Sequence, residues 1–215
     1  MTNPVIGQPI LRNEDLRLLT GKGQYSDDVN LENQAYAVMV RSPHAHARIL
    51  NIDSAAALAL PGTLAVLTGQ DWLEDGHGPI PHSPIPSGGD GLGMNDEKWS
   101  KVYVGRNYPL APDRPRFAGE AVAMVIAESD AIAHEAAELV SVSYEELPAV
   151  AVTADAIKAD APRVWDEIDT NVCLDTTFGD CAATEAAFAA AHHITRMSFR
   201  IARNTGVPME PRAGV

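Results

Sequence analysis

The chain has 215 residues, of which 46% are hydrophobic and 21% are charged, a composition that is ordinary for a globular protein. Its 16 basic and 29 acidic residues give a formal net charge of −13. This balance argues against binding to nucleic acid or to an anionic membrane, because both need clusters of basic side chains. No stretch approaches the ~20 apolar residues that cross a bilayer, and no secretory signal is evident, so we expect a cytoplasmic protein.

Strands and short helices alternate along the first part of the sequence. After an extended arm, residues 13–19 predict a short helix with Asn13 as its N-cap. The apolar run 35–40 predicts a strand buried on both faces, and the alternating run 47–52 predicts its neighbour in the sheet. Further elements expected before residue 76 are a short helix capped by Asp53, a third strand at 63–67 and a helical turn at 70–73.

The segment 76–96 is rich in proline and glycine and has no periodicity, so we expect a long surface loop. The strongest strand signal follows at 121–127. Ser129 is then expected to cap a helix that ends near residue 139. The apolar face of this helix is predicted to consist of Ile132, Ala136 and Leu139, and a strand is predicted at 140–144.

Regular alternation ends near residue 148, where we place a domain boundary followed by an irregular connector. The alanine-rich run 184–191 predicts a helix, and the alternating run 193–201 predicts a half-buried strand. Cys173 and Cys181 are too few and too far apart for an iron–sulfur or zinc cluster, and we expect both to be reduced and buried. The mixture of strands and short helices indicates an α+β fold with a mixed sheet.

Three stretches carry a resemblance to a known family: Arg41-Ser-Pro-His-Ala-His-Ala-Arg48, Phe117-Ala-Gly-Glu-Ala-Val-Ala-Met-Val-Ile126 and Met209-Glu-Pro-Arg-Ala-Gly-Val215. In this order and spacing they resemble the N-terminal part of the molybdenum-containing large subunit of the xanthine dehydrogenase/aldehyde oxidase/carbon monoxide dehydrogenase family. The domains that the resemblance implies are an N-terminal arm at 1–17, an α/β hammerhead domain at 18–148, and the linker and truncated start of a molybdenum-cofactor-binding domain at 149–215.

His44 and His46 form a His-x-His pair. On a strand, positions i and i+2 point to the same side, so both imidazoles would reach one metal ion if His77 or His82 supplied a third ligand. Pro43 instead suggests a turn, and the resemblance implies a structural turn that enters the second strand. We therefore expect no metal site in this chain. The glycine-rich run 87–93 lacks the flanking elements of a phosphate-binding loop and is interpreted as a linker.

Gly119 and Glu120 directly precede the strongest predicted strand. Glycine permits a tight turn, and the glutamate would serve as a general base or accept hydrogen bonds from the backbone. Glu210 and Arg212 flank a proline and have opposite charges, which suggests an ion pair. The resemblance places the first pair near the cofactor region and the second beside the substrate channel. We expect all four to support the site rather than to catalyse.

The resemblance implies a molybdenum ion on molybdopterin, with iron–sulfur clusters and FAD on partner subunits. It also implies a glycine-rich segment, a glutamine that contacts the pterin and a late glutamate base, and none of these occurs in the 215 residues. We therefore predict no catalytic residue here. The chain would supply the hammerhead domain and a wall of the substrate funnel to an enzyme that hydroxylates aldehydes or N-heterocycles with water-derived oxygen. It would need a second chain that carries the rest of the molybdenum-binding domain.

Two alternatives remain open. One is a non-catalytic binding or assembly module, or a gene remnant, derived from the same family. The other is a small metal-dependent hydrolase that uses His44 and His46.

Overall fold

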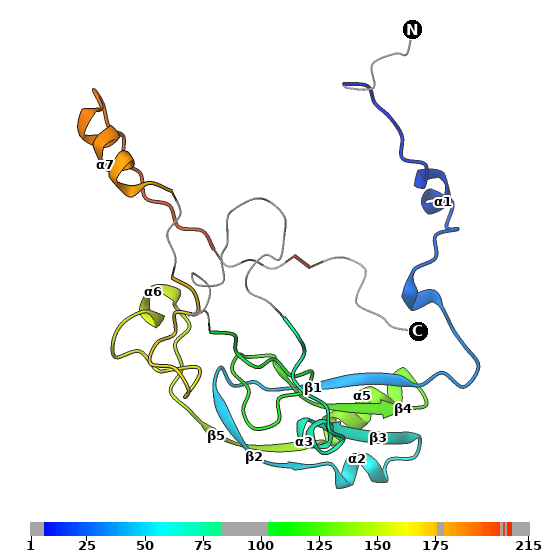
Figure 1. Ribbon diagram of the computed structural model, residues 1–215. Helices are drawn as coiled ribbons and strands as arrows, with labels where there is room; N and C mark the ends of the chain where they lie inside the picture. Colours follow the sequence, from blue (N-terminus) through cyan, green and yellow to red (C-terminus); the bar gives the residue numbers. More distant parts are fainter. Residues whose placement is uncertain (1–6, 83–102, 176–178, 203, 205, 208–215) are drawn as a thin grey trace. The chain divides into compact units, whose positions relative to one another are not determined.

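A computed structural model of the chain describes residues 7–82, 103–175, 179–202, 204 and 206–207. The chain divides into two units, Met1–Gln34 with His192–Val215, and Ala35–Ala191. The strands all belong to the second unit (Figure 1). No helix in the described ranges has the length and apolar character that crossing a membrane requires.

The centre of the second unit is a three-stranded antiparallel sheet with the order β1-β4-β3. Its strands are β1 (Tyr36–Arg41), β4 (Ala121–Ala127) and β3 (Thr63–Thr68). The strand predicted at 121–127 is confirmed, and its position between two others explains its continuous apolar sequence. Its fully buried residues are Val122, Ala123, Val125 and Ala127.

A second, two-stranded sheet pairs β2 (Ala47–Asp53) with β5 (Ser141–Glu146). The prediction that residues 47–52 lie beside the 35–40 strand was wrong, because the partner of β2 is β5. The start of β2 is also hydrogen-bonded to the loop before β4. The N–H of Ala47 donates to the carbonyl of Pro115, and the N–H of Ile49 donates to the carbonyl of Asp113. β1 pairs instead with β4.

Two helices, α2 (Ala55–Ala59) and α5 (Asp130–Leu139), pack on one face of the three-stranded sheet. The predicted cap of α5 is confirmed, because the Ser129 hydroxyl accepts the N–H of Ile132. The Asp53 carboxylate accepts the N–H of Ala55 at the start of α2, although the N-cap position itself is held by Ser54.

The predicted apolar face of α5 was right at Ala136, which is buried, and wrong at Leu139, which is 40% exposed. Ile132 is half-buried, and the second buried residue is Ala133. Small alanine side chains let the helix lie close to the sheet, so the alanines and not the larger residues mark the contact face. The core that results contains Ala57, Val125, Ala136 and Val140, with Val40, Ile52, Leu60 and Val66 packed around them.

Two predictions for the earlier elements also need correction. In α1 (Asp15–Leu19) the N-cap is Glu14 and not Asn13, and no side chain caps the helix. In β1 burial alternates along the strand and Met39 is 39% exposed, so the strand is not buried on both faces. The helical turn predicted at 70–73 is confirmed as α3 (Gly69–Glu74), which begins with a capping box between Thr68 and Asp71.

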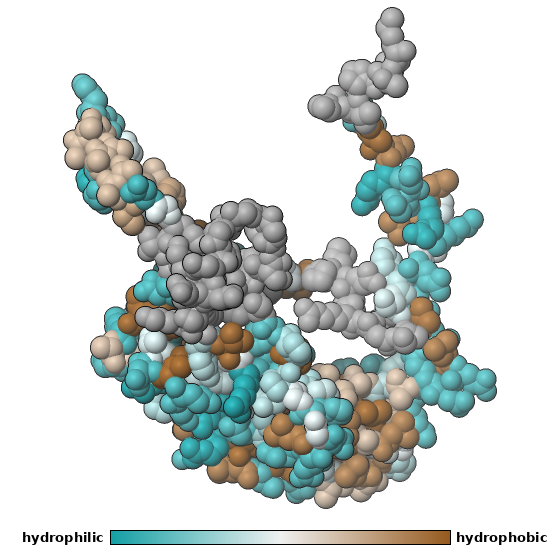
Figure 2. Space-filling view, in the orientation of Figure 1, coloured by the Kyte–Doolittle hydropathy of each residue, from teal (hydrophilic) through white to brown (hydrophobic). Residues whose placement is uncertain are grey.

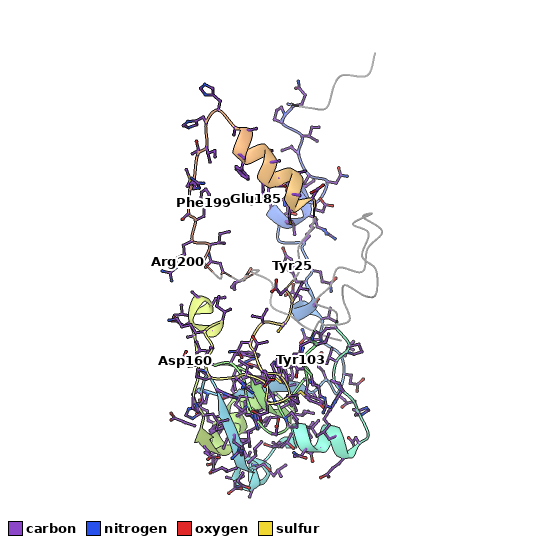
Figure 3. All side chains as sticks on the ribbon, turned by 60° about the vertical axis from the view of Figure 1, so that its left-hand side comes forward. Tyr25, Tyr103, Asp160, Glu185, Phe199 and Arg200 are labelled. Carbon is purple, nitrogen blue, oxygen red and sulfur yellow. The ribbon has the colours of Figure 1, made fainter. Side chains whose placement is uncertain are left out.

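Beyond residue 148 the described elements are α6 (Thr153–Ala156) and α7 (Cys181–Ala190). Cys173 and Cys181 are free, as expected, but both are exposed, so the prediction of burial was wrong. The strand predicted at 193–201 is also wrong, because these residues are extended but unpaired and exposed. In Figure 3 Phe199 and Arg200 lie on this extended segment. The boundary near residue 148 remains a prediction.

Candidate functional site

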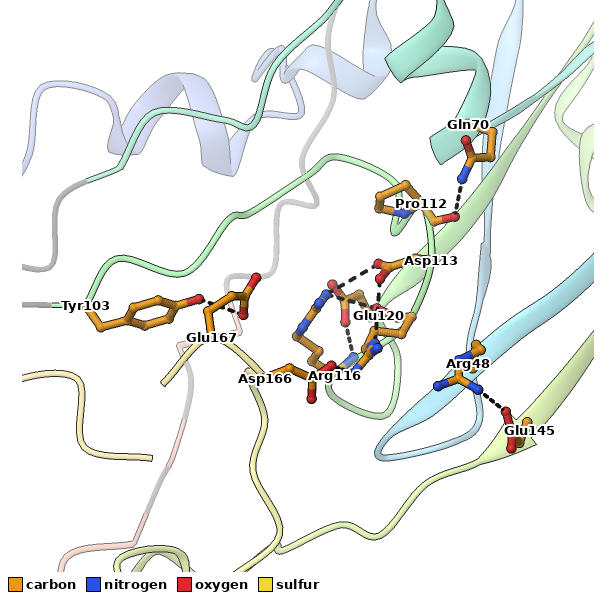
Figure 4. A network of polar contacts seen from close by, with 11 residues as sticks. Arg48, Gln70, Tyr103, Pro112, Asp113, Arg116, Glu120, Glu145, Asp166 and Glu167 are labelled. Atoms are coloured by element: carbon orange, nitrogen blue, oxygen red, sulfur yellow. Dashed lines mark hydrogen bonds and ion pairs between the residues drawn. The ribbon is translucent and has the colours of Figure 1, made fainter. Parts of the chain in front are cut away.

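Polar side chains gather around the loop 103–120 that leads into β4 (Figure 4). They surround a cavity of about 350 Å³, whose lining includes His82, Arg106, Asn107, Arg116, Glu120 and Trp165. Two residues of this lining had been marked by the sequence, Glu120 as a supporting residue of the site and His82 as a possible metal ligand. The cavity is open to solvent and carries charges of both signs.

Glu120 is fixed on several sides by backbone groups. Its carboxylate accepts the N–H of Arg116, its own N–H donates to the carbonyl of Phe117, and its carbonyl accepts the N–H of Ser42. Burial raises the pKa of the Glu120 carboxyl, and the N–H and guanidinium of Arg116 partly oppose the rise. This arrangement closes the turn 116–120.

Gly119 has a φ of +93°, and a side chain at this position would meet no atom within 4 Å. Glycine is therefore required by the backbone conformation and not by lack of space. Its N–H donates to the carbonyl of Ser42 over 2.8 Å, and its carbonyl accepts a hydrogen bond of 2.8 Å from Nη1 of Arg41. The turn is thereby joined to the end of β1, immediately before the residues that enter β2.

Two arginines link this loop to residues beyond 148. Nη1 of Arg114 lies 2.9 Å from Oδ2 of Asp166, and the guanidinium of Arg116 lies 4.0 Å from the centre of the Trp165 ring. Asp113 approaches both arginines, at 3.6 and 3.9 Å. The Arg114 and Arg116 side chains are only 15% and 16% exposed, but Asp166 and Asp113 are 71% and 55% exposed, so solvent reaches these ion pairs.

Tyr103 extends the same contact. Its hydroxyl donates to Glu167 over 3.4 Å, and its ring lies 5.8 Å from that of Trp165. Burial raises the pKa of Tyr103, and the negative charge of Glu167 raises it further. Val164 and Trp165 thus form one side of the cavity, and Asp166 and Glu167 hold this segment against the loop.

The four histidines that were considered as metal ligands lie in different surroundings. His44 and His46 are part of the bend between β1 and β2, which agrees with a structural turn that enters the second strand. Nδ1 of His46 is 3.1 Å from the carbonyl of Pro148, while Nε2 is buried without a partner. The His44 ring packs on Tyr144 and its Nδ1 is 3.5 Å from Glu146.

The other two histidines do not join this pair. The His77 ring lies 4.5 Å from the Trp72 ring, and Nδ1 of His82 is 3.2 Å from the carbonyl of Ile80. In the described part of the chain, no group of three or more His, Cys, Asp or Glu side chains is arranged to hold a metal ion. The arrangement therefore lends no support to a hydrolase based on His44 and His46.

Other predicted features cannot be placed. Glu210, Arg212 and the glycine-rich run 87–93 lie outside the described residues. Conversely, sequence reasoning missed Arg114, Arg116 and Trp165. The alternation Arg114-Pro-Arg116 was a visible signal of paired charges, but nothing local indicates that a tryptophan nearly 50 residues later stacks on the second arginine.

Small antiparallel sheets backed by short helices, together with a cavity walled by loops, define a small α+β scaffold domain. Residues 20–148 match the family model described as "Aldehyde oxidase and xanthine dehydrogenase, a/b hammerhead domain". The chain belongs to this family, and the resemblance and the α+β fold expected from the sequence are confirmed.

Curated relatives of known function are much longer than this chain. The chain is 33% identical to the 6-hydroxypseudooxynicotine dehydrogenase complex subunit gamma of Paenarthrobacter nicotinovorans, over 98% of this chain and 25% of the relative. It is 34% identical to the carbon monoxide dehydrogenase large chain of Afipia carboxidovorans, over 93% of this chain and 24% of the relative. The chain therefore spans about a quarter of the length of these relatives.

Solved structures also match most of this chain but only a part of their own length. Quinoline 2-oxidoreductase from Pseudomonas putida 86 is similar with a TM-score of 0.63 and 40% identity, over 76% of this chain and 19% of that chain. The Cu,Mo-CO dehydrogenase is similar with a TM-score of 0.67 and 33% identity, over 87% of this chain and 23% of that chain.

Proposed function

We propose that this chain supplies the hammerhead domain and a wall of the substrate funnel to a cytoplasmic molybdenum hydroxylase, and that it is inactive alone. The enzyme would hydroxylate an aldehyde, an N-heterocycle or a similar substrate with oxygen from water. The observation that carries the proposal is the alignment: nearly the whole chain matches oxidoreductase subunits, but it matches only about a quarter of each. The remainder of the site would come from parts of the enzyme outside these 215 residues.

The described residues do not fit a molybdopterin by themselves. A pterin with its phosphate needs many convergent hydrogen-bonding groups in a closed pocket. In the cavity beside Glu120, the carboxylate is engaged with the Arg116 backbone, the Arg116 guanidinium is stacked on Trp165, and Arg106 is exposed. We therefore assign the molybdenum cofactor to the rest of the domain, outside these 215 residues, and the iron–sulfur clusters and FAD to further subunits.

Within such an enzyme, Gly119 and Glu120 would hold the turn that borders the cavity, and Glu210 and Arg212 would brace the segment beside the substrate channel. The positive φ of Gly119 and the backbone contacts of Glu120 support this role for the first pair.

Exposed apolar side chains also support a missing partner. The extended segment 193–201 places Met197, Phe199 and Ile201 at alternate positions, and they are 70%, 79% and 90% exposed. Such side chains in a row are typical of an interface. If the segment adds to a sheet of the partner, they would all face one side.

The test is to purify the tagged chain from its native host and to measure molybdenum, iron and flavin in what elutes with it. We expect a larger polypeptide and all three cofactors. Phe199→Ser should reduce their recovery, whereas Ser198→Ala, on the opposite side of an extended segment, should not. If the chain elutes alone and free of metal at every salt concentration, the split-enzyme proposal fails, and the non-catalytic module or remnant replaces it.

A further inference from the structure

One face of the three-stranded sheet is only partly covered. Helices α2 and α5 pack on the opposite face. On the uncovered face Met39, Met124 and Leu67 lie side by side in register across β1, β4 and β3. Met39 and Leu67 are 39% and 38% exposed. In Figure 2 apolar residues gather where β3 and β4 lie beside α3. The exposed face of an antiparallel sheet is usually polar, so an exposed face of large apolar side chains is suited to a partner.

The face forms a groove of about 270 Å³ rather than a flat surface. Met39, Met124 and Leu67 make its floor, and Trp72 and Leu110 contribute to its walls. The walls are held in place without any ligand. Nε1 of Trp72 donates to the carbonyl of Gly78 over 2.9 Å, and Leu110 is only 5% exposed. A preformed apolar groove lowers the ordering cost of binding.

The groove is acidic. Among the described residues, its lining includes Asp71, Asp75 and His77, and no lysine or arginine. Asp71 is fixed by the capping box of α3, where its Oδ2 accepts from the N–H and the hydroxyl of Thr68. Asp75 ends the same helix and is exposed. A ligand that matches both the floor and these carboxylates is apolar with adjacent positive charge.

We propose that this groove docks a polypeptide segment of a partner protein in which leucine-like side chains are flanked by lysine or arginine. The apolar side chains enter the groove over the two methionines, and the basic groups meet Asp75 and Asp71. Charge complementarity decides against a second copy of the same face, because an isologous dimer would place acidic groups opposite acidic groups. The inference concerns a surface separate from the cavity beside Glu120 and does not depend on the proposed function.

The test uses the full chain with ¹³C-methyl methionine, whose six methionine signals are assigned with Met39→Leu and Met124→Leu. The probe is the peptide Ac-Lys-Leu-Leu-Lys-NH₂, followed by NMR titration. We expect saturable shifts of the Met39 and Met124 signals. Asp75→Asn should weaken binding by about two- to fivefold, the effect of one rim charge. The matched control is Glu74→Gln, which removes a charge from the same helix outside the groove and should leave the affinity unchanged.

Three outcomes would overturn the inference. The first is the absence of shifts at about 10 mM peptide, a concentration that reveals even millimolar affinity. The second is equal binding of Ac-Glu-Leu-Leu-Glu-NH₂, which would show that the acidic rim selects nothing. The third is a shift of the two signals with protein concentration alone, accompanied by a doubled mass in light scattering, which would assign the groove to a second copy.

Discussion

Replacing Gly105 with alanine tests whether residues beyond 148 are an integral part of the fold. An ideal Cβ at Gly105 would lie 2.4 Å from Cζ2 and 2.6 Å from Cε2 of Trp165. Restoring an ordinary contact requires the indole to move by about 1 Å, away from its stacking distance of 4.0 Å over Arg116. Overpacking of this kind costs about 1–3 kcal/mol, and the lost stacking adds about 0.5–1 kcal/mol. We expect Gly105→Ala to lower the free energy of unfolding by about 1.5–4 kcal/mol.

Urea unfolding followed by circular dichroism measures the loss, and Gly78→Ala is the matched control. A Cβ at Gly78 meets nothing within 4 Å, so this variant should stay close to the parent. In a Trp165→Phe background, Gly105→Ala should lower the free energy of unfolding by at least about 0.5 kcal/mol less than it does in the parent. This difference is the interaction energy expected for two residues in contact. Equal costs in both backgrounds, or a neutral Gly105→Ala, would show that Trp165 does not pack on this loop.

Three further predictions concern single contacts, each measured by urea unfolding. Ser129→Ala removes the acceptor for the first turn of α5 and should cost about 1 kcal/mol, and a loss below 0.3 kcal/mol would contradict the cap. Gly119→Ala should cost about 1–2 kcal/mol through its positive φ alone, although there is room for the methyl group, and a neutral effect would contradict the turn geometry. Burial raises the pKa of Glu120 in the folded state, so the stability that this group contributes at low pH is lost as pH rises through the raised pKa. Glu120→Gln should therefore become more stable relative to the parent from about pH 4 to about pH 8. Glu138→Gln, on the exposed side of α5, is the control, and parallel stability curves for Glu120→Gln and the parent would refute the argument.

The sequence predicted the local elements better than their partners. Periodicity located β4 and α5 within a residue or two because each is specified by its own residues: a continuous apolar run in one case and a serine cap in the other. The pairing of β2 was not predictable in this way. The partner strand, β5, begins only at Ser141, and no local pattern of β2 encodes a contact so distant in the sequence.

The same distinction applies to the candidate site, where locally encoded features were predictable and long-range contacts were not. Gly119 was recognisable because a left-handed turn demands glycine, and that demand is local. The stacking of Arg116 on Trp165 was not, because either residue alone looks like an ordinary surface arginine or a buried tryptophan. The prediction that Cys181 is buried was wrong. No residue of α7 is buried, although the helix has a strongly apolar composition.

The unpaired segment 193–201 shows how a pattern can specify a strand that the described fold does not form. Alternation fixes which side chains share a face, but a strand exists only when a neighbour satisfies its backbone groups. Burying Met197, Phe199 and Ile201 on a partner would contribute about 4.5–9 kcal/mol, at about 1.5–3 kcal/mol for each side chain. Association itself costs about 4–15 kcal/mol, so this segment alone gives weak binding and a stable complex needs a further surface.

Phe199→Ser should then weaken the complex by at least about tenfold in a pull-down titration, because the loss of one large side chain exceeds about 1.4 kcal/mol. An unchanged affinity would mean that the exposed row of side chains lies outside the interface.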